Sequence, residues 1–192
     1  MGGQLYLTST SPRRRDLLRQ AGLDFILHPP GPEPDGSGTP ADLAVMRARE
    51  KALGAPAPDL PGWILGVDTV VGLAGKEFGK PTDEADAARM LRALRGREHV
   101  VYSGHALVEV HPQTVFEPPC VQTQLAESRV YCRSFSEQEL DVYLATGDWT
   151  DKAGAYGIQD AACSFMSLRE GALDTVIGLH IPAVHALLGG LS

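Results

Sequence analysis

The feature that most constrains the fold is an apolar run, Trp63 to Val71 (WILGVDTVV), which contains a single carboxylate, Asp68. Such a run predicts a largely buried strand. Because an unpaired ionised carboxylate is very costly in a buried strand, Asp68 must be hydrogen-bonded, paired with a cation or bound to a metal. A structural aspartate at a strand end explains the residue equally well.

Strand and helix signals alternate along the rest of the chain. Strands are predicted over residues 4–9, 100–110 and 121–132, with two shorter ones joined at 169–171. Helix-start signals occur at Ser11-Pro12, Thr39-Pro40, Asp83–Asp86 and Ser136–Glu139, with a last helix after Pro182. Helices alternating with adjacent strand pairs imply an α/β fold with a mixed sheet. We expect one domain spanning residues 1–192.

Residues 28–40 (HPPGPEPDGSGTP) contain too much proline and glycine for regular structure. A loop of this length is uncommon inside a domain unless it has a function, so it is a candidate active-site flap. A plain surface excursion is the alternative interpretation.

The formal net charge of the 192 residues is -7, which provides no overall basic surface for nucleic acid. Polymeric nucleic acid is therefore not expected as a partner.

The three cysteines are widely spaced without a CxxC pair, which argues against a disulfide framework and a zinc site. No signal peptide is evident, and no apolar run approaches the roughly 20 residues of a membrane helix. We expect a cytoplasmic protein without a membrane anchor.

The segment from Ser9 to Arg15 (STSPRRR) places three arginines at a predicted strand-to-helix junction. Cations at a helix N-terminus oppose the helix dipole, so something should compensate them. An anion bound to the free N–H groups, the hydroxyls of Ser9 and Ser11 and a guanidinium would do so. A solvated basic turn beside acidic neighbours is the alternative. The segment is not a Walker loop, because GxxxxGK[ST] is absent.

Two lysines stand in positions from which they could neutralise phosphate. Lys80 lies between glycine and proline in GKP, and Lys51 lies near the end of a predicted helix. Taken singly, each is more often a solvated surface lysine.

The segment Asp151–Asp160 (DKAGAYGIQD) contains Gly154 and Gly157, which allow a ligand to approach the backbone closely. Gln159 offers a donor and an acceptor together, which suits O4 and N3–H of uracil or thymine. A tight turn with a surface amide is the alternative.

Five segments in this order, STSPRRRDLL, AREKA, GVDTVV, GKP and DKAGAYGIQ, resemble the Maf family of nucleotide pyrophosphatases. The resemblance spans nearly the whole chain. It implies an elongated mixed α/β fold similar to inosine triphosphatases, with a nucleotide in a cleft between two lobes. It also implies hydrolysis of a nucleoside triphosphate between the α and β phosphates.

The resemblance implies roles for individual residues. Asp68 is similar to the family's proton acceptor, which would activate the attacking water. The residues that resemble its phosphate- and metal-handling groups are Ser9, Arg13, Arg14, Lys51, Lys80 and Asp151. A divalent cation, Mg²⁺ or Mn²⁺, is the implied cofactor, with Glu33 and Asp68 as its expected ligands. Magnesium prefers one or two carboxylates plus substrate phosphates, so few protein ligands are needed.

Three positions are similar to the branch of the family that acts on dTTP and UTP: Arg13, Thr69 and Gln159. The 7-methyl-GTP branch typically has Trp, Gln and Glu there. We therefore expect the protein to hydrolyse dTTP and UTP, with modified uridine triphosphates as further substrates, in a house-cleaning role for the nucleotide pool.

Two rival hypotheses remain. One is a nucleotide-binding regulator of septum formation that acts through a protein partner, and the other is a general phosphatase. The sequence leaves the oligomeric state open, and a homodimer is one candidate.

The chain departs from the family pattern at three places. Glu33 is followed by Pro34 and Asp35, where the family usually carries two adjacent acidic residues. Asp160 replaces the glycine usual after GIQ, and His180 replaces the proline of the family's GLP. The first departure leaves open whether Glu33 serves alone or Asp35 stands in, and the other two affect loop shape near the base.

Overall fold

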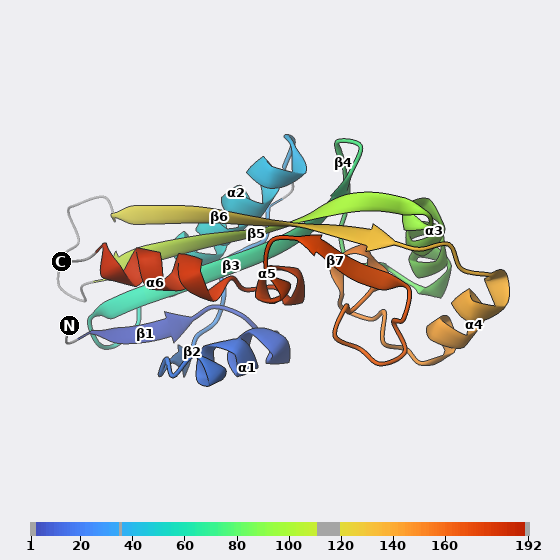
Figure 1. Ribbon diagram of the computed structural model, residues 1–192. Coiled ribbons are helices and arrows are strands. Elements are labelled where there is room, and N and C mark those ends of the chain that lie inside the picture. Colours follow the sequence, from blue (N-terminus) through green and yellow to red (C-terminus); the bar gives the residue numbers. More distant parts are fainter. Residues whose placement is uncertain (1–2, 35, 111–119, 191–192) are drawn as a thin grey trace.

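A long mixed sheet of seven strands is the central feature of the computed structural model, which describes residues 3–34, 36–110 and 120–190 (Figure 1). The strands are β1 (Gln4–Leu7), β2 (Ile26–Leu27), β3 (Gly62–Leu73), β4 (Lys76–Phe78), β5 (Arg97–Val110), β6 (Val121–Cys132) and β7 (Met166–Glu170). Their order is β2-β1-β3-β5-β6-β7, and β4 pairs with β3. β1 is parallel to β2 and β3, whereas the other pairs are antiparallel.

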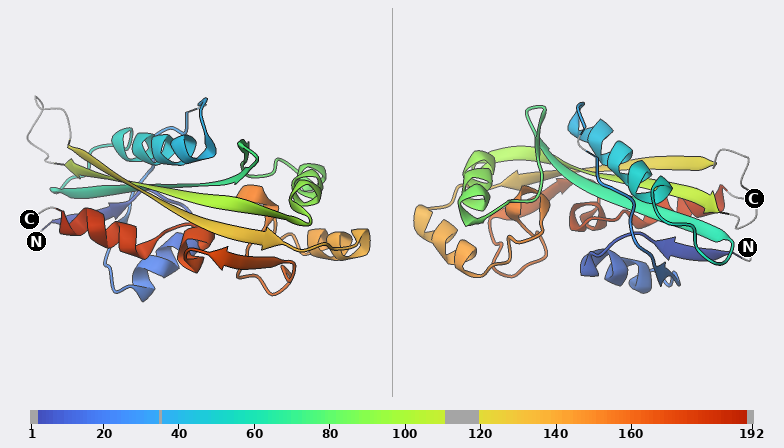
Figure 2. Two further views of the ribbon diagram at one scale, coloured as in Figure 1. Left: turned by 45° about the horizontal axis from the view of Figure 1, so that its top comes forward. Right: turned by 180° about the vertical axis from the view of Figure 1, so that it is seen from behind.

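Helices cover both faces of this sheet. They are α1 (Pro12–Gln20), α2 (Pro40–Leu53), α3 (Glu84–Leu94), α4 (Glu137–Ala145), α5 (Leu173–Ile177) and α6 (Ile181–Gly189), with a 3₁₀ turn, η1, at Ala153–Ala155. α2 lies on one face, and α1 and α6 lie on the other (Figure 2). None of the described helices is long and apolar enough to cross a membrane.

Two apolar cores lie toward opposite ends of the long strands. One packs β1, β3, α1 and α6 around Leu7, Leu18 and Leu187. The other packs α3, α4 and β7 around Leu91, Leu140 and Phe165. β5 has 14 residues, and at about 3.3 Å per residue it reaches roughly 45 Å, so it contributes to both cores. The expected elongated α/β fold with two lobes is confirmed.

Side-chain caps explain where two of the helices begin. At α2, Thr39 accepts a hydrogen bond from the Asp42 N–H, and the Asp42 carboxylate accepts one from the Thr39 N–H. Ser136 and Glu139 form the same reciprocal cap at α4, as the sequence predicts. Ser11 is the N-cap of α1, but its side chain makes no capping hydrogen bond.

The prediction of two strands joined at 169–171 is wrong in its second half. The chain turns at Gly171, with φ of 88°, and then forms α5. The β-branched residues of LDTVI favour a strand, but tertiary contacts decide otherwise. The hydroxyl of Ser103 on β5 donates to the carbonyl of Thr175 at 2.9 Å, which anchors this short helix against the sheet.

Candidate functional site

The candidate site lies where β3 lacks a neighbouring strand on one side. β1 pairs with β3 as far as Leu65, and β4 pairs with it from Val71. Between these points, residues 66–70 have no strand partner on that side in the described part of the chain. Successive side chains of a strand point to opposite faces, so this free edge gives one ligand access to groups on both faces.

A pocket of about 430 Å³ opens at this edge, between the α1 end of the protein and the loop that follows α4. All ten residues to which the family resemblance assigns a role line it: Ser9, Arg13, Arg14, Glu33, Lys51, Asp68, Thr69, Lys80, Asp151 and Gln159. They come from segments that are far apart in the sequence. Glu33 brings the candidate flap to the pocket wall, whereas Asp35 lies outside the described residues.

Two glycines allow α2 to lie directly on the sheet beside Asp68. A Cβ atom on Gly104 of β5 would lie only 2.7 Å from the backbone nitrogen of Val45. A Cβ on Gly66 of β3 would lie 2.9 Å from the backbone nitrogen of Ala52. Gly104 is also the register partner of Asp68. Because only glycine permits this approach, the end of α2 is held against the free edge of β3.

Lys51, near the end of α2, bridges two carboxylates. Its Nζ lies 2.5 Å from Oδ1 of Asp68 and 3.0 Å from Oε2 of Glu33. The Asp68 residue is only 6% exposed, so the ammonium compensates a buried charge. Of the partners that the sequence allows for this carboxylate, the structure provides the cation. Oδ2 of Asp68 receives no hydrogen bond from the described residues.

Lys51 and two further cations keep the carboxyl of Glu33 ionised. Burial by itself would raise the pKa of this carboxyl. The hydrogen bond and the charge of Lys51, together with the charges of Lys80 and Arg47, outweigh burial and lower the pKa below its ordinary value. Glu33 is therefore an anion at neutral pH.

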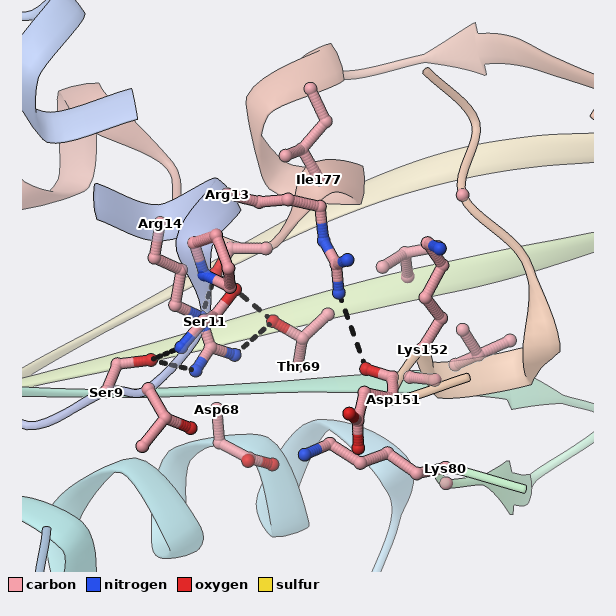
Figure 3. Close-up of a pocket in the computed structure, with 18 of the residues that line it drawn as sticks. Ser9, Ser11, Arg13, Arg14, Asp68, Thr69, Lys80, Asp151, Lys152 and Ile177 are labelled. Carbon is pink, nitrogen blue, oxygen red and sulfur yellow. Dashed lines mark hydrogen bonds between the residues drawn. The ribbon is translucent and has the colours of Figure 1, made fainter. Parts of the chain in front are cut away.

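Arg14 links three segments instead of facing the pocket with a free guanidinium (Figure 3). Its Nε donates to the carbonyl of Gly178 at 2.8 Å, and Nη1 donates to the carbonyl of Val67 at 3.0 Å. Nη1 also donates to Ser9 Oγ, and Nη2 donates to Thr69 Oγ1. Four of its five N–H groups are thus engaged, which leaves at most one for a phosphate.

The buried position of Arg14 affects the pKa of its guanidinium. Burial lowers the pKa of its guanidinium, and the negative charge of Asp68 opposes that shift. Arg14 nevertheless stays protonated, because an arginine remains charged in proteins. It contributes a fixed positive charge beneath the pocket.

Arg13 approaches the pocket from the same helix as Arg14, and Lys80 and Asp151 approach it from two further segments, as Figure 3 shows. A guanidinium nitrogen of Arg13 donates to the carbonyl of Asp151 at 3.4 Å. The N–H of Gly154 donates to the carbonyl of Gly79, next to Lys80, at 3.0 Å. This backbone bond ties the GKP turn to the loop after α4, so Lys80 and Asp151 are held on the same wall.

Sequence reasoning missed two cations in the pocket lining. Arg47 lies one helical turn before Lys51, and its Nη1 is 3.0 Å from Glu77. Its i, i+4 spacing from Lys51 is a signal that could have identified it. Lys152 directly follows Asp151, and its Nζ is 3.0 Å from a carboxylate oxygen of Asp160.

A second part of the pocket is apolar and lies beside two buried, neutral side chains that contact each other. Val71, Val101 and Ile177 line it, beside the ring of Tyr156. The hydroxyl of Tyr156 lies 2.7 Å from Nε2 of His99. Burial lowers the pKa of His99 to about 4 and raises the pKa of Tyr156, so both groups are neutral near pH 7. An apolar wall of this kind suits the face of a nucleobase.

Few protein groups in this pocket are suited to a metal ion. The described residues contain no group of three or more His, Cys, Asp or Glu placed to hold one. Asp68 and Glu33 are the two carboxylates joined by Lys51. One or two carboxylates are what Mg²⁺ requires when substrate phosphates complete its coordination. The donor set therefore fits a metal that enters together with a phosphorylated ligand.

Known proteins are similar to this chain over nearly its whole length. The family described as Maf-like protein matches residues 4–191. A dTTP/UTP pyrophosphatase of Dictyoglomus thermophilum is 38% identical over 100% of this chain and 97% of its own length. Proteins of the same name from Pelotomaculum thermopropionicum and Bordetella pertussis are 37% and 42% identical, over 96% of this chain and 95% and 91% of their own lengths. The chain belongs to the Maf-like protein family.

Proposed function

We propose that this protein is a nucleoside triphosphate pyrophosphatase that hydrolyses dTTP and UTP to the monophosphate and pyrophosphate. The observation that carries the proposal is a buried carboxylate, Asp68, at a free strand edge in a pocket lined by cations. The names of the relatives support the substrates. Modified uridine triphosphates that keep the same base edge are further candidates.

The triphosphate would be bound by charges that surround the free edge of β3. Arg13, Lys80 and Lys152 contribute positive side chains from three segments of the pocket lining. The first turn of α1 adds backbone N–H groups that have no partner within the helix. Because the Ser11 side chain makes no cap there, these N–H groups are available to an anion.

Asp68 is the proposed proton acceptor. Its Oδ1 is held by Lys51, whereas Oδ2 has no hydrogen bond from the described residues and is free to accept one from water. As that water attacks the α-phosphorus of the triphosphate, its proton passes to Asp68 and a new P–O bond forms. The bond between the α-phosphorus and the pyrophosphate oxygen then breaks. The lysines and Arg13 would stabilise the charge that collects on the leaving pyrophosphate.

Asp68 and Glu33 are the residues that would hold a divalent cation. When bound, Mg²⁺ or Mn²⁺ would neutralise phosphate oxygens and polarise the phosphorus toward attack. Lys51 contacts both carboxylates, so it would keep them oriented toward the phosphates. The cytoplasm, which supplies nucleotides and Mg²⁺, is the proposed location.

Recognition of the base is assigned to Gln159 more than to Thr69. The Thr69 hydroxyl already lies within hydrogen-bond distance of three groups: Arg14 Nη2, Ser103 Oγ and the Gly178 carbonyl. Thr69 would contribute to specificity indirectly, by fixing the positions of α1 and of the backbone at Gly178. Gln159 is exposed at the pocket and carries both a donor and an acceptor for uracil or thymine.

A panel of canonical and modified nucleotides, with Mg²⁺ or Mn²⁺, tests the proposal. We expect UTP and dTTP to give the fastest release of pyrophosphate. Orthophosphate as the product would indicate the general phosphatase. Tight nucleotide binding without turnover would indicate the septum-formation regulator, which the enzyme names of the relatives do not favour.

A further inference from the structure

The carboxylate of Asp160 folds back over the loop that carries Gln159. Its Oδ1 accepts a hydrogen bond from Nε2 of Gln159 at 2.8 Å, and its Oδ2 lies 3.0 Å from Nζ of Lys152. Gly157 leaves the necessary space, because a Cβ atom there would lie 2.7 Å from Cγ of Asp160. The Asp160 side chain is 21% exposed and the Lys152 side chain 11%, so the contact is largely shielded.

This contact decides which end of the Gln159 amide is free. A carboxylate has no donor, so only Nε2, and not Oε1, can face the Asp160 oxygen. A half-turn of the amide would exchange the two atoms, and Asp160 disfavours that half-turn. Oε1 of Gln159 receives no hydrogen bond from the residues that the structure describes. Gln159 therefore presents its carbonyl as a free acceptor in the lining of the pocket.

The order of donor and acceptor distinguishes the pyrimidine bases. Uracil and thymine carry the acceptor O4 beside the donor N3–H. Cytosine carries the donor N4–H₂ beside the acceptor N3, which is the reverse order. An amide with one fixed orientation matches one of these orders, whereas a reversed amide matches the other.

We propose that Asp160 is a positioning residue that makes the protein prefer uracil and thymine over cytosine by fixing the orientation of the Gln159 amide. The inference rests on the proposed function, in which Gln159 contacts the base. Asp160 itself does not contact the substrate. Lys152 contributes by holding the second oxygen of Asp160, so the carboxylate cannot turn away from Gln159 without losing its ion pair.

The variant Asp160→Asn tests this orientation, because it is expected to reverse the amide. Lys152 has only donors, so it would hold the oxygen of the new asparagine. The asparagine amide nitrogen would then take the place of Oδ1 and donate to Oε1 of Gln159, turning Nε2 of Gln159 outward. We expect the UTP-to-CTP ratio of kcat/KM to fall roughly 10-fold, the equivalent of one lost hydrogen bond. The change should lie in KM, because the base is remote from the reacting phosphorus.

Asp160→Gly releases the amide without reversing it, so its UTP-to-CTP ratio should fall less than that of Asp160→Asn. Asp141→Asn is the matched control, because it removes the same charge from an exposed position on α4. Its ratio should equal that of the unmodified protein. Thermal unfolding of each variant confirms that the fold is kept.

An unchanged UTP-to-CTP ratio of kcat/KM in Asp160→Asn would overturn the inference. If kcat/KM fell equally for both nucleotides, the role of Asp160 would be merely structural. Binding of α,β-imido analogues of UTP and CTP gives the same ratio as dissociation constants, without turnover. A protein that releases no pyrophosphate from UTP would refute the proposed function. The ratio of analogue affinities in Asp160→Asn and the unmodified protein would still decide the role of Asp160.

Discussion

Asp68→Asn separates the chemical role of this carboxylate from its structural one. The variant keeps the side-chain shape and an oxygen that can accept from Lys51, but it removes the group that takes the proton. We expect kcat to fall roughly 100- to 10,000-fold, the usual contribution of a general base. Nucleotide binding should persist, because the cations of the pocket lining are unchanged.

The expected loss of stability is small, for reasons visible in the site. Breaking a buried ion pair completely costs about 3–5 kcal/mol. Here Lys51 retains Glu33 at 3.0 Å and the new amide oxygen, so about 1 kcal/mol is expected. For a chain of 192 residues this lowers Tm by roughly 2–4 °C, measurable by calorimetry.

Glu33→Gln is the matched control, because it also removes a carboxylate from Lys51. Glu33 is the more exposed of the two, with 53% of its side chain accessible. If it only helps to hold the metal, a higher Mn²⁺ concentration should restore much of its activity, but not that of Asp68→Asn. Pyrophosphate release by Asp68→Asn at the unmodified rate would refute the proton-acceptor role.

Three further predictions follow from the packing around the site. Arg14→Met should lower the free energy of unfolding by about 2–4 kcal/mol, as measured by urea titration. Arg13→Met should mainly raise KM. Equal stability of the two variants would contradict the linking role of Arg14. Gly104→Ala should cost about 1–3 kcal/mol by displacing α2, and should lower activity together with stability; an unchanged Tm would contradict this. His99 has its pKa lowered from 6.5 to about 4 by burial, so the unfolded chain binds more protons and stability must fall between pH 6.5 and 4. His99→Gln should flatten that fall in calorimetry, and an unaltered slope would contradict the assignment.

Much of the site can be predicted from the sequence because its residues occur in short motifs at element boundaries. Ser9 lies between a strand and a helix, Arg13 lies in the first turn of that helix, and Lys80 lies in a rigid turn. Asp68 is conspicuous because it interrupts an apolar strand. These signals are local, and the order of the motifs joins them into one expected pocket.

Other features depend on contacts that no local pattern specifies. The sequence places Arg14 beside Arg13 on one helix, yet only the tertiary structure shows that Arg14 is bound to the carbonyls of Val67 and Gly178. The helical state of α5 is likewise decided by packing on β5, against the strand preference of its residues. The gap in the sheet beside residues 66–70 depends on where two other strands end.

The central claim is most directly tested by the products of a single reaction. The purified protein is incubated with UTP and Mg²⁺ or Mn²⁺, and UMP, UDP, pyrophosphate and orthophosphate are measured together. The account predicts UMP and pyrophosphate in equal amounts, without UDP or orthophosphate. UDP with orthophosphate, or UTP that binds and is never cleaved, would contradict it.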